Sequence, residues 1–175
     1  VGLTTVQLHE ASDEERAATA PFRYPDTGTY PGEQMRMVDQ VEIFAPKGGA
    51  NDLGYIQGSI DVDPSFWFFQ AHFKQDPVWP GSLGVEAFLQ LLKHVAIERW
   101  SVTDAPILET LADGCEHSWV YRGQVIPKDN KVTVQVTVTA SDDATQRLSA
   151  DGYLCVDGRI IYQLNDFCIH LKPGT

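Results

Sequence analysis

A histidine, a glycine and a glutamate lie close together in a segment whose backbone is held by two prolines. His72 is followed by Pro77, by Pro80-Gly81 and then by Glu86. Proline fixes φ near −65° and favours the first turn of a helix, so it restricts the path of the chain between these residues. An imidazole and a carboxyl group in a fixed arrangement are what a proton-transfer reaction needs. Residues 71–91 are therefore the candidate site.

Glu86 is the only charged side chain between residues 81 and 92. A lone carboxyl group on a buried helix loses hydration, which favours its neutral form, and that form suits a proton donor. A second interpretation stays open at this point. Glu86, Gln90, Lys93 and His94 follow the i, i+4, i+7, i+8 spacing of one helix face and would then form a solvated stripe.

His72 lies in a loop-like stretch, where an imidazole titrates near neutral pH and can act as a base. The other histidines come with neither a constrained turn nor a nearby acid, so they are interpreted as structural: His9, His94, His117 and His170. No two histidines have the close spacing of metal ligands, and no cysteine cluster completes a set. No metal site is predicted.

Gly81 lies where a helix is expected to begin. The first N–H groups of a helix have no intrahelical acceptor and lie at the positive end of its dipole. They can hold a carbonyl oxygen that gains negative charge. Taken alone, Gly81 fits a plain helix-starting glycine better.

The elements that position these residues follow from two periodicities. Apolar and polar residues alternate over 35–44 and 56–62, which predicts two strands joined by a loop at 48–52. Nine of the thirteen residues in 85–97 are apolar and are spread around the whole helical circumference. That segment predicts a helix that is buried on nearly all sides.

The chain then returns to strand patterns over 119–126, 132–138, 153–156 and 159–171. Asp157-Gly158 between the last two is a two-residue hairpin signal, because both turn positions need positive φ. One fully apolar helix among five or six antiparallel strands can be buried only if the sheet curls around it. The predicted fold is therefore an α+β hot-dog fold.

Length and composition fit one folded domain with an N-terminal extension. The chain has 175 residues, 43% of them hydrophobic. Residues 1–35 are polar and rich in turn formers, so they are interpreted as an arm or linker, and residues 36–175 as the hot-dog domain. The charged segment 13–16 either begins a short helix or belongs to a solvated linker, and the linker is favoured. The start lacks both an initiator Met and a signal peptide, so we expect a piece of a longer protein.

The charge balance excludes several classes of partner. Thirteen Lys+Arg against twenty-four Asp+Glu give a net charge of −11. Such a chain repels phosphate backbones and anionic lipid surfaces, so nucleic acid is not expected as a partner. The longest apolar runs, 66–69 and 89–92, are far shorter than the roughly 20 residues of a membrane span.

The three cysteines are odd in number and far apart, and they lie in apolar, strand-like stretches: Cys115, Cys155 and Cys168. This pattern argues against a disulfide framework and against a zinc knuckle. We expect each thiol to be a small core residue and the protein to occupy a reducing compartment, the cytoplasm.

The candidate segment resembles a known active-site motif. His72-Phe73, Pro77 to Gly81 and Leu83 to Ala87, followed by Gln90-Leu91, are similar to the active-site segment of bacterial β-hydroxyacyl-ACP dehydratases, especially the β-hydroxydecanoyl dehydratase/isomerase branch. Stretches 121–127, 131–133 and 156–162 resemble strands of the same branch, so the similarity covers roughly residues 36–171. The amino-acid sequence of residues 75–84 is most similar to that of dehydratase domains of polyunsaturated fatty acid synthases.

The resemblance implies roles for individual residues. His72 would remove the α-proton, Glu86 would protonate the departing hydroxyl, and the Gly81 amide would polarise the thioester carbonyl. The substrate would be a 3-hydroxyacyl thioester carried on the phosphopantetheine arm of an acyl carrier protein, with no metal or redox cofactor. The residues expected to contact it are Phe73, Val78, Trp79, Pro80, Ser82 and Gln90.

The sequence also departs from the dehydratase/isomerase branch. That branch has Asp at the position of Glu86 and Cys at the position of Ser82, whereas the dehydratase-only branch also has Glu. A trans-2-enoyl product without isomerisation is therefore expected. Trp79 replaces a smaller apolar residue and either reshapes the mouth of the acyl tunnel or packs in the core.

Two other functions remain as alternatives. A hot-dog thioesterase would use an acid to activate water and release free acid, and a non-catalytic acyl-binding half of a double hot-dog would lack His72 or Glu86. In the resembling family the histidine and the acid meet across a two-fold interface. We therefore expect a homodimer, or a pseudo-dimer with a second hot-dog domain. Because carrier proteins are usually acidic as well, docking would rely on a local basic patch or on tethering within one polypeptide.

Overall fold

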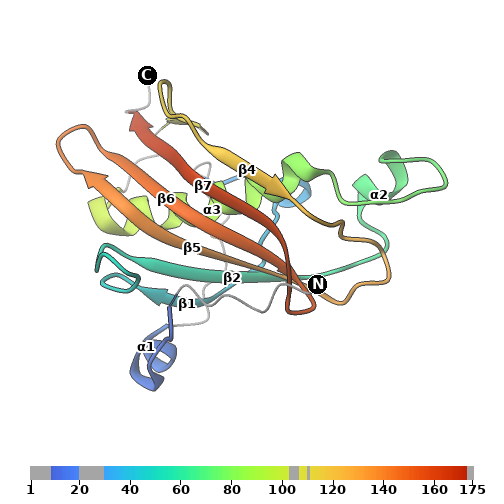
Figure 1. Ribbon diagram of the computed structural model, residues 1–175, viewed down its shortest axis with the longest axis horizontal. Coiled ribbons are helices and arrows are strands. Elements are labelled where there is room, and N and C mark those ends of the chain that lie inside the picture. The colour runs from blue at the N-terminus through green and yellow to red at the C-terminus, as the bar shows by residue number, and fades with distance from the viewer. Residues whose placement is uncertain (1–8, 20–29, 103–106, 110, 173–175) are drawn as a thin grey trace.

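One antiparallel sheet wraps around a long helix in the computed structural model, which describes residues 9–19, 30–102, 107–109 and 111–172 (Figure 1). Among these residues the strands are β1 Gln40–Ala45, β2 Tyr55–Asp61, β3 Ile107–Glu109, β4 Ser118–Tyr121, β5 Lys131–Asp142, β6 Arg147–Val156 and β7 Arg159–Lys172. Their order is β1-β2-β5-β6-β7-β3, and β4 also pairs with β7. The helices are α1 Asp13–Ala18, the 3-10 turn η1 Glu33–Met35, α2 Trp67–Ala71 and α3 Gly81–Trp100.

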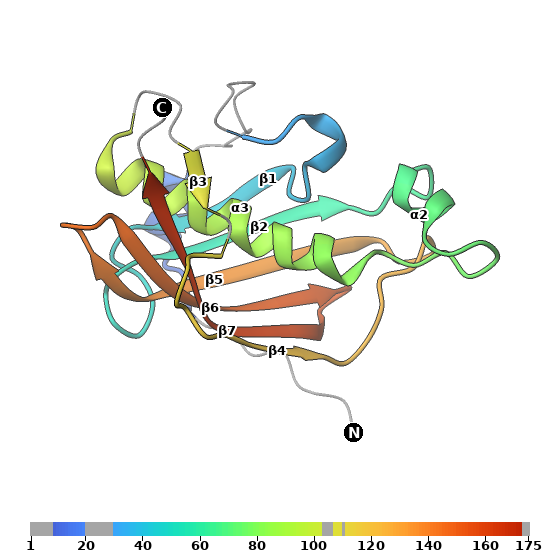
Figure 2. The same ribbon diagram turned by 90° about the horizontal axis from the view of Figure 1, so that it is seen from above.

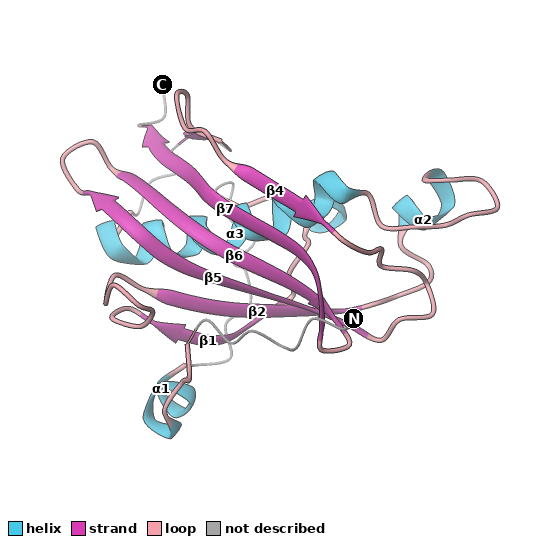
Figure 3. Ribbon diagram, in the orientation of Figure 1, coloured by secondary structure: helices cyan, strands magenta, loops and turns pink. Residues whose placement is uncertain are grey.

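The helix α3 lies along the concave face of the sheet, and α2 lies beyond one end of it (Figures 2 and 3). Side chains on every side of α3 are buried, among them Ala87, Phe88, Leu91 and Leu92, none of which is exposed to solvent. The predicted hot-dog fold and its buried central helix are confirmed. The helix is longer at both ends than the predicted 85–97 and stops at Ser101, which has a left-handed φ of 48°.

The last hairpin has the predicted turn, since Asp157 and Gly158 have φ of 48° and 78°. The strand before it, β6, begins six residues earlier than predicted. Two of its three buried residues there, Ala150 and Gly152, are small, and Gly152 leaves no room for a side chain because a Cβ would lie 2.6 Å from the Phe88 ring. A strand packed this tightly against a helix lacks the β-branched residues by which strands are recognised in sequence.

Two further strand boundaries and the linker prediction for residues 13–16 were also wrong. The strand expected over 35–44 begins only at Gln40, because residues 33–35 form η1. The strand expected over 119–126 ends at Tyr121, six residues before Pro127. A helix, α1, forms where a solvated linker was favoured over residues 13–16. It carries a capping box in which the Ser12 and Glu15 side chains bond to each other's backbone N–H groups.

The cysteine expectation was wrong for two of the three residues. Cys115 and Cys168 form a disulfide, while Cys155 is a free, buried thiol as predicted. The partners are 53 residues apart in sequence, but Ala112 N–H donates to the Cys168 carbonyl at 2.9 Å and places the loop beside β7. The distance between two cysteines along the chain therefore did not indicate whether the fold brings them together.

None of the helices within the described ranges is long and apolar enough to cross a membrane.

Candidate active site

His72 is held at the C-terminal end of α2 by its backbone and by its ring. Its N–H donates to the Phe68 carbonyl at 2.8 Å, and its carbonyl accepts from Val78 N–H at 2.9 Å. The ring Nδ1 lies 3.1 Å from the Val78 carbonyl oxygen. Because a carbonyl only accepts, Nδ1 carries the proton and Nε2 of the neutral ring keeps its lone pair. The half-buried imidazole is thus fixed in the tautomer that can take a proton at Nε2.

The loop from Phe73 to Pro80 is tied back at both ends. Phe73 and Asp76 exchange backbone hydrogen bonds of 3.0 and 3.1 Å, and Trp79 N–H donates to the Val125 carbonyl at 2.9 Å. The Trp79 ring is 1% exposed and packs 4.7 Å from the Phe68 ring. This loop therefore fixes the distance between the end of α2 and the start of α3.

The start of α3 offers free backbone donors. Pro80 is the N-cap and makes no side-chain cap, while its carbonyl accepts from Leu83 and Gly84. The N–H groups of Gly81 and Ser82 have no acceptor within the helix. A Cβ on Gly81 would lie 2.8 Å from the far end of the Trp119 ring, so a larger residue would have to displace this partly exposed side chain. The N-terminal amides of α3 can therefore polarise a carbonyl oxygen.

Glu86 lies on the second turn of α3, half-buried, and Gln90 lies one turn further on. Gln90 Nε2 donates to Glu86 Oε1 at 2.9 Å. The Gln90 amide is itself 1% exposed and is bonded to the backbone of Met35 and Met37. The solvated stripe is therefore wrong as a description of this face, because a buried amide orients the carboxyl group of Glu86.

The structure distributes the predicted substrate-contacting residues over two environments. Val78, Trp79 and Gln90 are buried in this chain, whereas Phe73 and Ser82 are exposed and Pro80 is half-buried. The Phe73 ring lies 3.9 Å from the His72 ring. No hydrogen bond or ion pair joins His72 directly to Glu86 within the part of the chain that the structure describes.

Several residues near the site were not predicted from the sequence to belong to it. Trp119 and Tyr121 on β4 are 42% and 44% exposed and flank Gly81, and Tyr121 stacks on the buried Tyr162 with ring centroids 4.8 Å apart. Trp67 on α2 and the backbone of 34–37 were also missed. Alternating aromatics in 119–121 gave a strand signal only, and nothing in the sequence marks a backbone segment as a support for Gln90.

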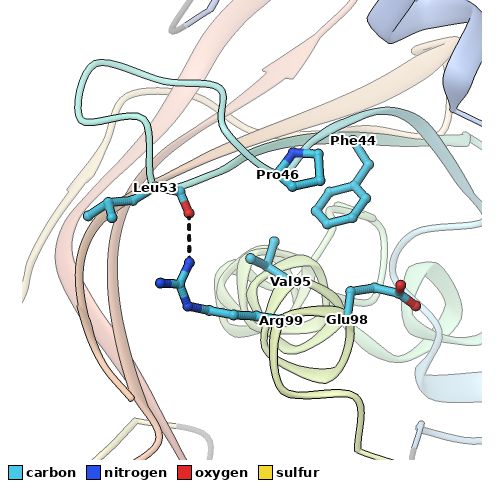
Figure 4. A pocket seen from close by; sticks show the side chains of 6 residues that line it. All are labelled: Phe44, Pro46, Leu53, Val95, Glu98 and Arg99. Carbon is cyan, nitrogen blue, oxygen red and sulfur yellow. Dashed lines mark hydrogen bonds between the residues drawn. The ribbon is translucent and has the colours of Figure 1, made fainter.

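A hollow lies at the opposite half of α3, lined by Phe44, Pro46, Leu53, Val95, Glu98 and Arg99 (Figure 4). Arg99 is already bonded there, to the Leu53 carbonyl at 3.5 Å and to Asp143 Oδ1 at 3.0 Å. None of the residues predicted to react lies in its wall. The hollow and the candidate site are therefore different places.

The family model described as the FabA-like domain matches residues 30–165, which include every residue of the candidate site. The chain belongs to the FabA-like domain family. This FabA-like chain is also 36% identical over 148 residues to a polyunsaturated fatty acid synthase protein of Thraustochytrium sp., and the match covers 81% of the chain but only 10% of that protein. The chain thus spans about a tenth of the length of this relative.

The FabA-like fold also has a solved structural counterpart. The structure titled "The Dehydratase Heterocomplex ApeI:P from Xenorhabdus doucetiae" superposes with a TM-score of 0.60, over 83% of this chain and 88% of that chain. The two sequences are 12% identical, so this likeness concerns the fold.

Proposed function

We propose that this FabA-like domain removes water from a 3-hydroxyacyl thioester carried on the phosphopantetheine arm of an acyl carrier protein, within fatty acid synthesis and most specifically polyunsaturated fatty acid synthesis. The observation that carries the proposal is the fixed tautomer of His72, whose Nδ1 lies 3.1 Å from the Val78 carbonyl oxygen. A histidine held in this way presents Nε2 as an acceptor, which suits a base that removes a proton.

The elimination balances with three groups of the chain. His72 Nε2 takes a proton from C2, the electron pair of that C–H bond forms the C2–C3 double bond, and the C3–O bond breaks. Glu86 in its acid form gives its proton to the departing hydroxyl, which leaves as water. The Gly81 N–H stabilises the negative charge that develops on the thioester oxygen. The product is a trans-2-enoyl thioester, and the scheme uses no metal or redox cofactor.

We also propose that two hot-dog units share each site. Two aromatic rings close to His72 expose apolar area in the described chain, with Phe73 at 58% and Trp67 at 46%. A two-fold copy, or a second hot-dog domain of a longer polypeptide, would cover these rings and bring a second set of groups to each site. Tethering in one polypeptide would also raise the effective concentration of the carrier without charge attraction.

The products of a 3-hydroxyacyl thioester separate this function from its rivals. The protein is incubated with the thioester, and the products are resolved by mass and by double-bond position. Loss of one water with the thioester intact and a trans-2 bond is the expected result, because the longer Glu86 replaces the isomerase branch's Asp. Abundant cis-3 product would establish a dehydratase/isomerase instead. Release of free hydroxy acid would overturn the dehydratase assignment in favour of a thioesterase.

A further inference from the structure

Trp67 combines an exposed ring with a well-formed internal hydrogen bond. The side chain is 46% exposed, yet its indole N–H donates to the Gln34 carbonyl at 2.8 Å. A surface tryptophan needs no such partner, because water can satisfy its N–H. The bond ties α2, whose C-cap is His72, to the segment that contains η1 and leads into β1. Figure 2 shows α2 beyond the N-terminal end of α3.

The residues directly after Gln34 hold the side chain of Gln90 on both sides. Gln90 Nε2 donates to the Met35 carbonyl at 2.8 Å, and Met37 N–H donates to Gln90 Oε1 at 3.0 Å. The second Nε2 hydrogen is directed to Glu86 Oε1 at 2.9 Å. The amide is fully buried, so the position of the 34–37 segment decides where this last donor points.

We propose that Trp67 is a positioning residue for Glu86. Its indole holds the 34–37 segment, the segment orients Gln90, and Gln90 fixes the carboxyl group that donates the proton. The inference rests on the proposed function, because it takes Glu86 as the acid. Proton transfer depends steeply on geometry, so a small displacement of the carboxyl group slows the reaction without weakening substrate binding.

A packing role is the alternative for Trp67, since its ring lies 5.6 Å from the Phe68 ring in an edge-to-face arrangement. Trp67→Phe keeps an aromatic ring and removes the indole N–H. The chain offers a matched control in Trp100, whose indole donates to Asp143 Oδ1 at 3.1 Å at the far end of α3. Trp100→Phe loses the same kind of bond without touching Gln90 or Glu86.

The first measurement is the kinetics of dehydration with a 3-hydroxyacyl thioester. Trp67→Phe removes one support of the Glu86 carboxyl group and is expected to lower kcat by about threefold to tenfold. KM should stay within about twofold, because Glu86 donates its proton in the transition state and not in substrate binding. Trp100→Phe should keep parental kcat and KM. An unchanged kcat in folded Trp67→Phe, or a change confined to KM, would overturn the proposal.

The second measurement repeats both changes in the Glu86→Gln background. If Trp67 acts through Glu86, Trp67→Phe causes no further loss once the acid is gone. A loss that multiplies with that of Glu86→Gln would contradict the positioning role. If Trp67→Phe does not fold by circular dichroism, Trp67→Tyr, which also lacks the indole N–H, is used for the same comparison.

Different results would overturn the role of Glu86 and the role of Trp67. Near-parental turnover in Glu86→Gln would overturn the proposed role of the acid itself. A large loss in Glu86→Gln together with parental turnover in Trp67→Phe would overturn only the role of Trp67.

Discussion

One histidine lies near each half of α3, and the surroundings of the two histidines allow them different roles. His72, beside the N-terminal half, is half-buried with a fixed Nδ1–H and an unshared Nε2. His94, in the C-terminal half, is 3% exposed, lies edge-on to the Phe44 ring at 5.3 Å, and has its Nδ1 3.4 Å from the Tyr30 hydroxyl. Burial lowers the pKa of His94 to about 4. A buried neutral histidine serves the core, whereas the half-buried one keeps a nitrogen for chemistry.

The two halves of α3 also differ in where the hollow lies and where the candidate reactive groups lie. The hollow beside Val95 and Arg99 belongs to the half of α3 without a candidate acid and base. The N-terminal half has free backbone amides, an oriented carboxyl group and a fixed imidazole nearby. The reaction is therefore assigned to the half of α3 that presents a carboxyl group, an imidazole and free backbone amides, and not to the hollow.

The largest effect is expected from changes at the N-terminal half of α3. His72→Ala and Glu86→Gln should each reduce dehydration by about 10²–10⁴-fold, because each removes one proton-transfer role. Turnover is measured beside circular dichroism, and the fold should be unchanged. If either variant keeps near-parental turnover, the role assigned to that residue is wrong.

A mixture of two inactive chains tests whether the sites are shared. His72→Ala is co-expressed or refolded with Glu86→Ala. In a shared-site homodimer each heterodimer holds one doubly damaged and one intact site, so random pairing restores about a quarter of parental activity. A mixture that contains heterodimers but stays inactive would place each site within one chain.

Much of the fold follows from periodicity, but the supports of the site do not. The alternation in 132–138 and the all-round apolar pattern of 85–97 predicted β5 and α3 because burial dictates side-chain type at those positions. The clamp on Gln90 uses the backbone of Met35 and Met37, and backbone groups are the same in every residue. Such contacts depend on how the chain folds back, which local pattern does not specify. The Cys115–Cys168 disulfide could not be predicted for the same reason, because it depends on how the loop folds back onto β7.

A smaller effect concerns His94 and acid stability. Its folded pKa of about 4 lies below the ordinary 6.5, so the unfolded chain binds more protons between these values. Stability contributed by the neutral ring is present above pH 6.5 and is lost as the pH falls towards 4. At 1.36 kcal/mol per pKa unit, the loss is about 3 kcal/mol.

Urea unfolding at several pH values checks this prediction. The change in unfolding free energy between pH 6.5 and 4 should be smaller in His94→Asn, which cannot titrate, than in the parent. Carboxyl groups titrate in both proteins and cancel in the difference. Parallel curves for the two proteins would show that His94 is not buried in neutral form.

The smallest effect is expected at the hollow. Arg99→Ala removes an exposed ion pair with Asp143, and exposed pairs contribute little to stability. Turnover should equal that of the parent, and the unfolding midpoint should hardly change. A clear loss of turnover would mean that the C-terminal half of α3 takes part in the reaction after all.

The location of bound substrate tests the central claim most directly. A 3-hydroxyacyl pantetheine amide, in which nitrogen replaces the thioester sulfur, is crystallised with the Glu86→Gln protein. The account predicts that the acyl carbonyl oxygen accepts from Gly81 N–H and that C2 lies beside His72 Nε2. An analogue whose acyl group instead occupies the hollow lined by Phe44, Val95 and Arg99 would contradict the account.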